Sequence, residues 1–115
     1  MQYMLLIYQN EAQMQKMREQ DIGAMMGAYG AYTKAMIDAG VFKAGDRLDR
    51  GANGTTVRSE NGKTKVLNGP YAETKEQLGG YYIIEAKDLD AALSWASRCP
   101  GVEHGVMEVR PILAM

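Results

Sequence analysis

The stretch Tyr3-Met4-Leu5-Leu6-Ile7-Tyr8 decides the fold. It is short, apolar and rich in aromatic and branched residues, which is typical of a central β-strand that is covered on both faces. Because successive side chains of a strand point to opposite sides, its odd-numbered residues share one face and its even-numbered residues share the other. The run Tyr81-Tyr82-Ile83-Ile84 repeats this pattern. We therefore expect a sheet that is apolar on both faces.

A helix is predicted after the first strand. Asn10 and Gln13 have the spacing of a capping box, which places the start of the helix near Glu11. From Ile22 onward, apolar residues recur at helical spacing as far as the natural stop at Gly40. These positions are Met25, Met26, Tyr29, Tyr32, Met36 and Ile37.

Three glycines, Gly23, Gly27 and Gly30, interrupt this helical pattern. Each costs about 1 kcal/mol relative to alanine, so the fold has to compensate for them. We expect close packing of the helix on the sheet at these positions. Space for a ligand beside the helix is the alternative.

A second helix is predicted near the C-terminus. Asp88 is its expected N-cap, and the turn Pro100–Gly101 ends it. The expected apolar stripe consists of Leu89, Ala92, Leu93 and Ala96. The final strand runs from Val106 to Ile112, with Pro111 near its end, where a strand tolerates proline.

A β-hairpin is predicted between the two helices, after an extended segment at Val41–Leu48. Thr55–Ser59 and Thr64–Leu67 flank Asn61-Gly62, which favours the positive backbone angles of a type I′ turn. This turn would place Val57 opposite Val66 and Glu60 opposite Lys63.

The predicted order is strand, helix, strand, hairpin, strand, helix, strand. Without the inserted hairpin this is the α+β, ferredoxin-like βαββαβ arrangement, in which both helices cover one face of an antiparallel sheet. Both faces of the central strands are apolar, yet the helices suffice for only one face. We therefore expect a homodimer in which two sheets pack together as a dimeric α/β barrel.

Length and composition limit the remaining possibilities. The 115 residues correspond to one domain, 1–115, and the net charge of −1 with no basic stripe argues against a nucleic-acid partner. Cys99 is the only cysteine, so no internal disulfide can form, and we interpret it as a small apolar filler rather than a reactive thiol. No basic segment precedes the first apolar run, and no apolar run approaches the roughly 20 residues of a membrane span. We expect a cytoplasmic protein with no membrane partner.

Four motifs carry a family resemblance. They are the opening Tyr3–Tyr8, Asn68-Gly69-Pro70-Tyr71 followed by Glu73-Thr74-Lys75-Glu76, Gly79-Gly80-Tyr81, and Glu108-Val109-Arg110-Pro111. Their order and spacing resemble the YCII-related family along nearly the whole chain, and specifically its DGPF branch. The resemblance implies a ferredoxin-like fold assembled as a dimeric α/β barrel.

The resemblance also implies candidate functions. The wider family includes a dehydrochlorinase that acts on a chlorinated hydroxyquinol, and an Asp–His acid–base pair has been suggested for some members. Many DGPF-like proteins are encoded beside extracytoplasmic-function sigma factors, which makes a sigma factor a candidate partner. The family's Asp is Asn68 here and its Phe is Tyr71. An amide cannot exchange protons as a carboxylate does, which argues against acid–base chemistry at Asn68.

Two candidate catalytic residues lie near the C-terminus. Glu108 shares a strand face with Arg110, on the side away from the helices, where Arg110 could bind an anionic or phenolic ligand while Glu108 moves protons. The alternative is an ion pair that serves only structure. His104 is the only histidine, and its ordinary pKa suits a general base.

Five further residues are candidate ligand contacts. Glu73 and Lys75 follow Asn68 and Tyr71, and the loop could fold over a cleft, although a solvated loop is the simpler interpretation. Arg58, on the hairpin, could join them. No metal-ligand cluster, phosphate-binding glycine loop or nucleophile elbow is present, so we expect no metal and no cofactor.

The sequence supports two functional hypotheses. The first is a homodimer that binds a small aromatic or anionic compound and performs cofactor-free acid–base or lyase-like chemistry. The second is a non-enzymatic, ligand-sensing or protein-binding module that works with a sigma factor. A subunit whose charges serve only assembly is a third possibility.

Overall fold

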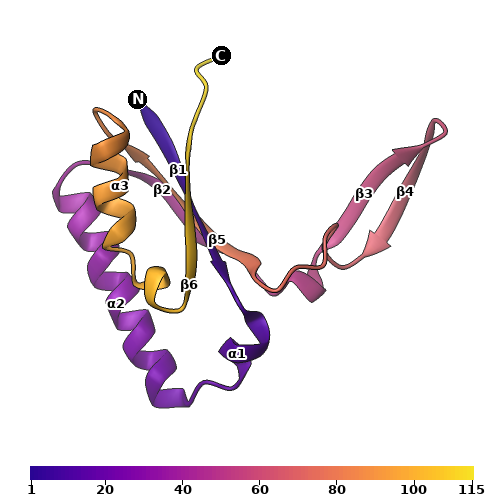
Figure 1. The fold of residues 1–115 in the computed structure, drawn as a ribbon, viewed down its shortest axis with the longest axis horizontal. Coiled ribbons are helices and arrows are strands. Elements are labelled where there is room, and N and C mark those ends of the chain that lie inside the picture. Colours follow the sequence, from indigo (N-terminus) through magenta and orange to yellow (C-terminus); the bar gives the residue numbers. More distant parts are fainter.

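The computed structural model describes residues 1–115 as a sheet with helices on one side and a separate hairpin on the other (Figure 1). The elements are β1 (Gln2–Gln9), α1 (Glu11–Gln15), α2 (Glu19–Asp38), β2 (Phe42–Arg47), η1 (Gly51–Asn53), β3 (Thr55–Glu60), β4 (Lys63–Asn68), β5 (Gln77–Glu85), α3 (Leu89–Ser97), η2 (Pro100–Glu103) and β6 (Gly105–Pro111).

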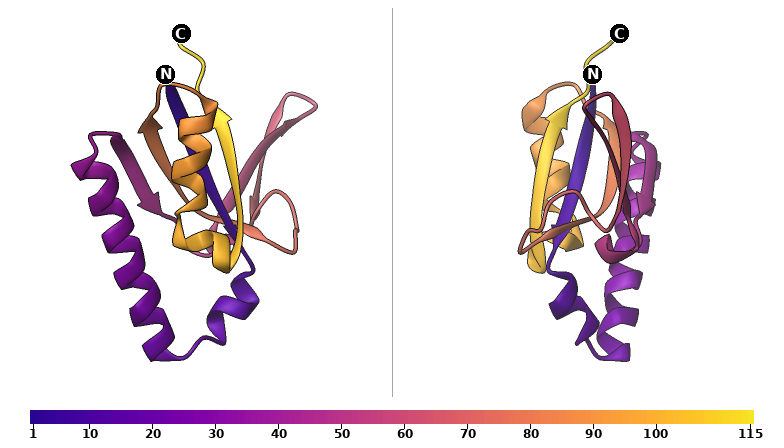
Figure 2. Two further views of the ribbon diagram at one scale, coloured as in Figure 1. Left: turned by 60° about the vertical axis from the view of Figure 1, so that its left-hand side comes forward. Right: turned by 90° about the vertical axis from the view of Figure 1, so that its right-hand side faces the viewer.

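The main sheet has four strands in the order β2-β5-β1-β6, and every neighbouring pair is antiparallel. The two most apolar strands, β1 and β5, therefore occupy its centre, as their composition predicts. Helices α2 and α3 lie on one face of this sheet (Figure 2). The architecture is α+β and is compatible with a ferredoxin-like fold.

The core lies between this sheet face and the two helices. From β1 it contains the odd-numbered residues of the opening stretch, which confirms the predicted alternation. The buried residues of the core are Tyr3, Leu5, Ile7, Tyr32, Met36, Tyr82, Ile84, Ala86, Ala92, Ala96 and Cys99. The Tyr32 hydroxyl donates a hydrogen bond to the Trp95 carbonyl oxygen (2.7 Å), which ties α2 to α3. None of the helices has both the length and the apolar character to cross a membrane.

The first predicted helix is two helices in the structure. The expected cap is present, because the Asn10 side chain accepts a hydrogen bond from the Gln13 N–H (3.0 Å) and α1 begins at Glu11. The helix ends at Gln15, however, and α2 begins only at Glu19. No residue of α1 is buried. A helix this short gains little stability from propagation. Since it also has no packed face, nothing holds it in line with α2.

The apolar stripes of both long helices are narrower than predicted. In α2, Met26 and Ile37 are exposed, while Met25, Tyr32 and Met36 face the core. In α3, the predicted Ala92 and Ala96 are buried in the core, whereas the predicted Leu89 and Leu93 are exposed. Residues four apart stack on one face of a helix, and the two alanines let α3 approach the sheet closely.

The prediction of close packing at the helix glycines is wrong. Gly23, Gly27 and Gly30 are exposed, and a Cβ atom at any of them would have no neighbouring atom within 4 Å. They lie on the outer face of α2, away from the sheet. This face of the helix is therefore smooth, apolar and uncovered in a single protomer.

Strands β3 and β4 form a separate two-stranded sheet with the predicted cross-strand pairs, Val57 with Val66 and Glu60 with Lys63. Asn61 and Gly62 have φ angles of 51° and 77°, as a type I′ turn requires. We call residues Thr55–Asn68 the arm, because they project away from the helices and the main sheet (Figure 1).

The cap of α3 gives a direct test of local stability. The Asp88 carboxylate accepts a hydrogen bond from the Ala91 N–H (2.9 Å). We expect Asp88→Ala to lower the free energy of unfolding by about 1 kcal/mol, whereas Asp88→Asn, which keeps an acceptor oxygen, should cost at most about 0.5 kcal/mol. Urea denaturation measures both, and equal losses for the two variants would contradict the capping role.

The buried acids of the core predict a pH dependence. Burial raises the pKa of the Cys99 thiol above its ordinary 9.0, and burial likewise raises the pKa values of Tyr32 and Tyr82. The unfolded chain therefore releases these protons at lower pH than the folded protein does. The stability that the neutral groups contribute is complete below pH 9 and falls as the pH rises further.

Denaturation by urea between pH 7 and pH 10.5 checks this expectation. In Cys99→Ala the loss of stability should begin only near pH 10, where unfolded tyrosine ionises. If the variant and the wild type lose stability equally between pH 8.5 and pH 9.5, the thiol is not responsible.

Candidate functional site

A cleft lies between the N-terminal half of α2 and the adjoining ends of β1, β2 and β5. Its inner part is a cavity of about 130 Å³ with mostly apolar walls. The side chains that form these walls include Ile7, Met14, Met25, Met26, Tyr29 and Tyr82. Its mouth is polar and contains Gln9, Glu11, Arg47 and Arg50. We refer to this cavity and its mouth as the cleft.

Two glycines in β5 leave room for the cleft. The pairing of β5 with β1 shifts register beside Gly79, so this residue has no partner in β1. A Cβ atom at Gly79 would lie 2.6 Å from the Gln9 side-chain nitrogen, and one at Gly80 would lie 3.0 Å from the Asp46 carbonyl oxygen. Any larger residue would displace these neighbours, which explains the glycine pair in an otherwise bulky strand.

Arg47 supplies a positive charge at the edge of the cavity. It ends β2, and its guanidinium lies 4.0 Å from the Met26 sulfur, while the Asp49 carboxylate interacts with its charge only at longer range. None of the ion pairs in the structure includes Arg47. An unpaired guanidinium with five N–H donors can bind a carboxylate, phenolate or similar oxygen anion.

The mouth also contains acidic groups, and both are held by backbone N–H donors. Glu11 accepts a hydrogen bond from the Gly51 N–H (2.7 Å), which ties α1 to the η1 turn. Asp49 accepts one from the Arg50 N–H (2.7 Å), and this bond is the main cause of its lowered pKa. Each carboxylate therefore orders the loop around the cleft.

Tyr29 lines the cavity from α2. Burial, followed by the neighbouring Cys99 thiol, raises the pKa of its hydroxyl above the ordinary value. A Cβ atom at Gly101 would lie 2.7 Å from the Tyr29 hydroxyl oxygen, so the absence of a side chain there makes space for this group. Tyr29 stays protonated at neutral pH, and its hydroxyl lies beside Gly101 and the Cys99 thiol rather than in the cavity.

The cleft has the size and chemistry for one planar ring with oxygen substituents. An apolar cavity of about 150 Å³ is large enough for benzene, so this cavity matches a single six-membered ring. Thioether and aromatic side chains would contact the faces of such a ring, while Arg47 offers N–H donors to its oxygen atoms.

The predicted pair Glu108 and Arg110 lies on the opposite face of the sheet. Arg110 Nε donates to Glu108 Oε2 (3.1 Å), and the Tyr8 hydroxyl lies 3.5 Å from Glu108 Oε1. The bond to Glu108 raises the pKa of Arg110 further. Both side chains are open to solvent in one protomer, as their strand alternation predicts.

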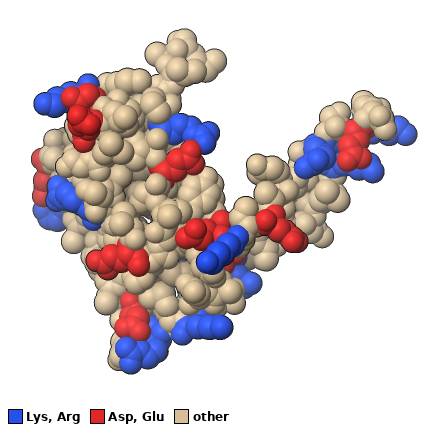
Figure 3. Space-filling model, viewed as in Figure 1, with Lys and Arg blue, Asp and Glu red and all other residues tan.

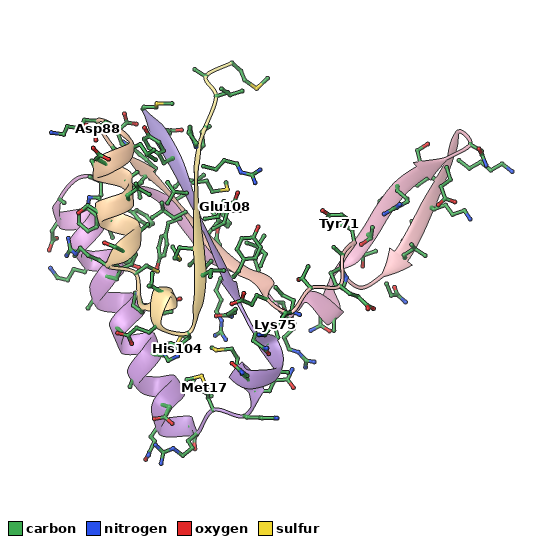
Figure 4. The ribbon with its side chains drawn as sticks, viewed as in Figure 1. Met17, Tyr71, Lys75, Asp88, His104 and Glu108 are labelled. Atoms are coloured by element: carbon green, nitrogen blue, oxygen red, sulfur yellow. The ribbon has the colours of Figure 1, made fainter.

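The other predicted residues lie in separate places. His104 follows η2 and is exposed in a shallow groove between α2 and η2, on the far side of β6 from the arm, whereas Tyr71 lies at the base of the arm and Lys75 near α1 (Figure 4). Asn68 ends β4 and Glu73 lies in the following loop, both exposed. Tyr71 is 80% exposed.

A single protomer therefore does not gather the predicted residues into one site. Arg58 lies in β3, opposite Lys65 of β4. No three His, Cys, Asp or Glu side chains lie close enough together to hold a metal ion.

Sequence reasoning missed the residues that form the cleft. Arg47 was one charge among many at the end of a strand, and Tyr29 was indistinguishable from the other apolar residues of its helix. The usable signal was Gly79-Gly80, because adjacent glycines leading into a bulky strand indicate a close approach of other groups.

Known proteins resemble this chain in sequence and in structure. The chain is 33% identical over 114 residues to an uncharacterised protein of Rhizobium meliloti (strain 1021), covering 97% of this chain and 92% of that one. Its structure resembles 5-chloro-2-hydroxyhydroquinone dehydrochlorinase (TftG) from Burkholderia phenoliruptrix AC1100, solved in complex with 2,5-dihydroxybenzoquinone.

That structural match has a TM-score of 0.51 and covers 98% of this chain and 94% of the dehydrochlorinase, with 16% sequence identity, so it concerns the fold alone. The family model of the YCII-related domain matches residues 1–115 in full. The chain therefore belongs to the YCII-related domain family.

Proposed function

We propose that this protein is a cytoplasmic homodimer that binds a small aromatic compound through an anionic or phenolic oxygen and performs cofactor-free, lyase-like chemistry on it. The observation that carries the proposal is the unpaired guanidinium of Arg47 at the edge of a ring-sized apolar cavity. The structural neighbour supports it, since 2,5-dihydroxybenzoquinone is a single ring with oxygen substituents.

The residues of the cleft supply complementary roles in an elimination. Such a reaction removes a proton and an anionic leaving group from the substrate, so negative charge develops on the ring oxygens. Arg47 would stabilise this charge at the edge of the apolar cavity. Glu11, one of the two carboxylates at the mouth of the cleft, would accept the proton.

A thermal-shift titration with 2,5-dihydroxybenzoquinone tests where the ligand binds. A ligand at about 100 times its Kd should stabilise the wild type by about 2.7 kcal/mol. We expect Arg47→Ala to weaken binding at least about tenfold, because it removes a charge-assisted contact, and Arg47→Lys to restore part of it. Arg110→Ala is the matched control and should leave binding unchanged. Unchanged binding by Arg47→Ala would contradict the assignment.

The open face of the sheet is the second candidate site. There Glu108, Arg110 and the Tyr8 hydroxyl would be enclosed between two sheets of a dimer. Asn68, Glu73 and Lys75 would have to reach this chamber from the loop after the arm. The same titration discriminates between the cleft and the open face, because loss of binding in Arg110→Ala but not in Arg47→Ala would favour the open face.

The non-enzymatic alternative predicts binding without conversion. If chromatography shows the bound compound unchanged after prolonged incubation with a panel of halogenated hydroquinones, a ligand-sensing module is the better interpretation. A sigma factor would then be the partner to test, which follows from the family resemblance alone.

The homodimer is proposed from the surface of the protomer. Only 15 of 115 residues are buried, and the radius of gyration is 16.0 Å where about 13 Å is usual for this length. The accessible surface is 7918 Å², against about 6,200 Å² expected for the mass. Much of the excess is apolar, since Met4, Leu6 and Ile83 point away from the helices on the open face.

Leu6→Lys tests the packing of two sheets. Leu6 lies between Tyr81 and Glu108 on the neighbouring strands, so the new ammonium would face a carboxylate and be tolerated in a monomer. Between two packed sheets it would be desolvated, and we expect a largely monomeric protein by light scattering at micromolar concentration. Leu93→Lys, on the outer face of α3, is the control and should remain dimeric. A monomeric wild type would overturn the proposal.

A further inference from the structure

The arm is nearly free of its own protomer. At its base the Thr56 hydroxyl donates to the Gly69 carbonyl oxygen (2.8 Å), and the Gly69 N–H donates to the Gly54 carbonyl oxygen (2.7 Å). Beyond this base, every residue of the arm is exposed. The views in Figures 1 and 2 agree that it projects on the side of the sheet opposite the helices.

Such an arm is poorly stable alone. A two-stranded hairpin in water is at best marginal, because it has no third layer to pack against. Val57 and Val66 lie directly opposite each other, on one face of the hairpin, yet they remain 63% and 62% exposed. This paired apolar surface is the part of the arm that would gain most from contact with another molecule.

We infer that the arm clasps a second copy of this chain and that the face of Val57 and Val66 is buried in this contact. The inference rests on the proposed homodimer. A copy that covers the open face of the sheet lies on the side where the arm projects, so the arm of each protomer flanks the other. Under two-fold symmetry both arms make the same contact.

The surface area leaves room for this second contact. The protomer exposes about 1,700 Å² more than expected for its mass. A standard interface removes about 800 Å² per partner, which corresponds to one sheet-on-sheet contact. The exposed arm contributes to the remainder, which therefore includes surface that a contact through the arm would remove.

Charge complementarity also favours a second copy over an unrelated surface. The arm carries Arg58, Lys63 and Lys65 against Glu60 alone, a net charge of +2. The whole chain carries −1, so the remainder carries −3. The cations gather toward the far end of the arm (Figure 3), so each arm is attracted to the body of the other copy.

The double variant Val57→Thr/Val66→Thr tests the clasp. Threonine preserves the β-branched shape and strand preference of valine but not its apolar surface. Four altered side chains per dimer should raise the dimer Kd at least about thirtyfold in sedimentation velocity. Leu67→Thr, on the opposite face of the arm, is the matched control and should change the Kd less than about threefold.

Each outcome bears on the clasp separately from the homodimer. If the double variant dimerises as tightly as the wild type, the clasp is wrong while the sheet contact stands. If the wild type is monomeric, both proposals fail. Amide hydrogen exchange provides a readout without mutation, because β3 and β4 should be protected above the dimer Kd and lose protection on dilution below it. Exchange in the arm that is independent of concentration would overturn the clasp.

Discussion

The structure depends on a four-stranded sheet that is apolar on both faces but has helices for only one. Burial of Tyr3, Leu5 and Ile7 beneath α2 and α3 supplies the core. Met4, Leu6 and Ile83 point the other way and stay partly exposed. The solvent-facing side of an antiparallel sheet is normally polar, so these side chains leave unusual apolar surface in contact with water. The arm adds further exposed apolar surface, since Val57 and Val66 are 63% and 62% exposed.

The cleft follows from the helix side of the same sheet. Helix α2 packs through Tyr32 and Met36 over the sheet, while its N-terminal half lies beside the cleft with Met25, Met26 and Tyr29. The break after α1 lets the chain turn back, so that Glu11 binds the Gly51 N–H and closes the mouth. A single unbroken helix would have carried the methionines away from β5.

Features set by neighbouring residues were predictable, and features set by distant ones were not. The caps at Asn10 and Asp88 and the turn at Asn61-Gly62 depend on a few adjacent residues, so the sequence specifies them. Strand alternation correctly placed Glu108 and Arg110 on the open face. The stripe of α3 was predicted too wide, because leucine and alanine are both apolar and only the distance to the sheet decides which of them is buried. The cleft joins residues of β1, α1, α2, β2 and β5, which no local pattern relates.

The two arginines that are candidates for ligand binding, Arg110 and Arg47, differ in the free-energy cost of binding an anion. Arg110 is already bound to Glu108, so an incoming anion has to displace that carboxylate or accept its repulsion. Arg47 has no carboxylate partner, and its neighbour is the weakly interacting sulfur of Met26. A ligand anion at Arg47 therefore forms a new charge pair without breaking one, beside an apolar cavity that strengthens it. This difference, rather than the family motif at Asn68–Tyr71, makes the cleft the stronger candidate for chemistry.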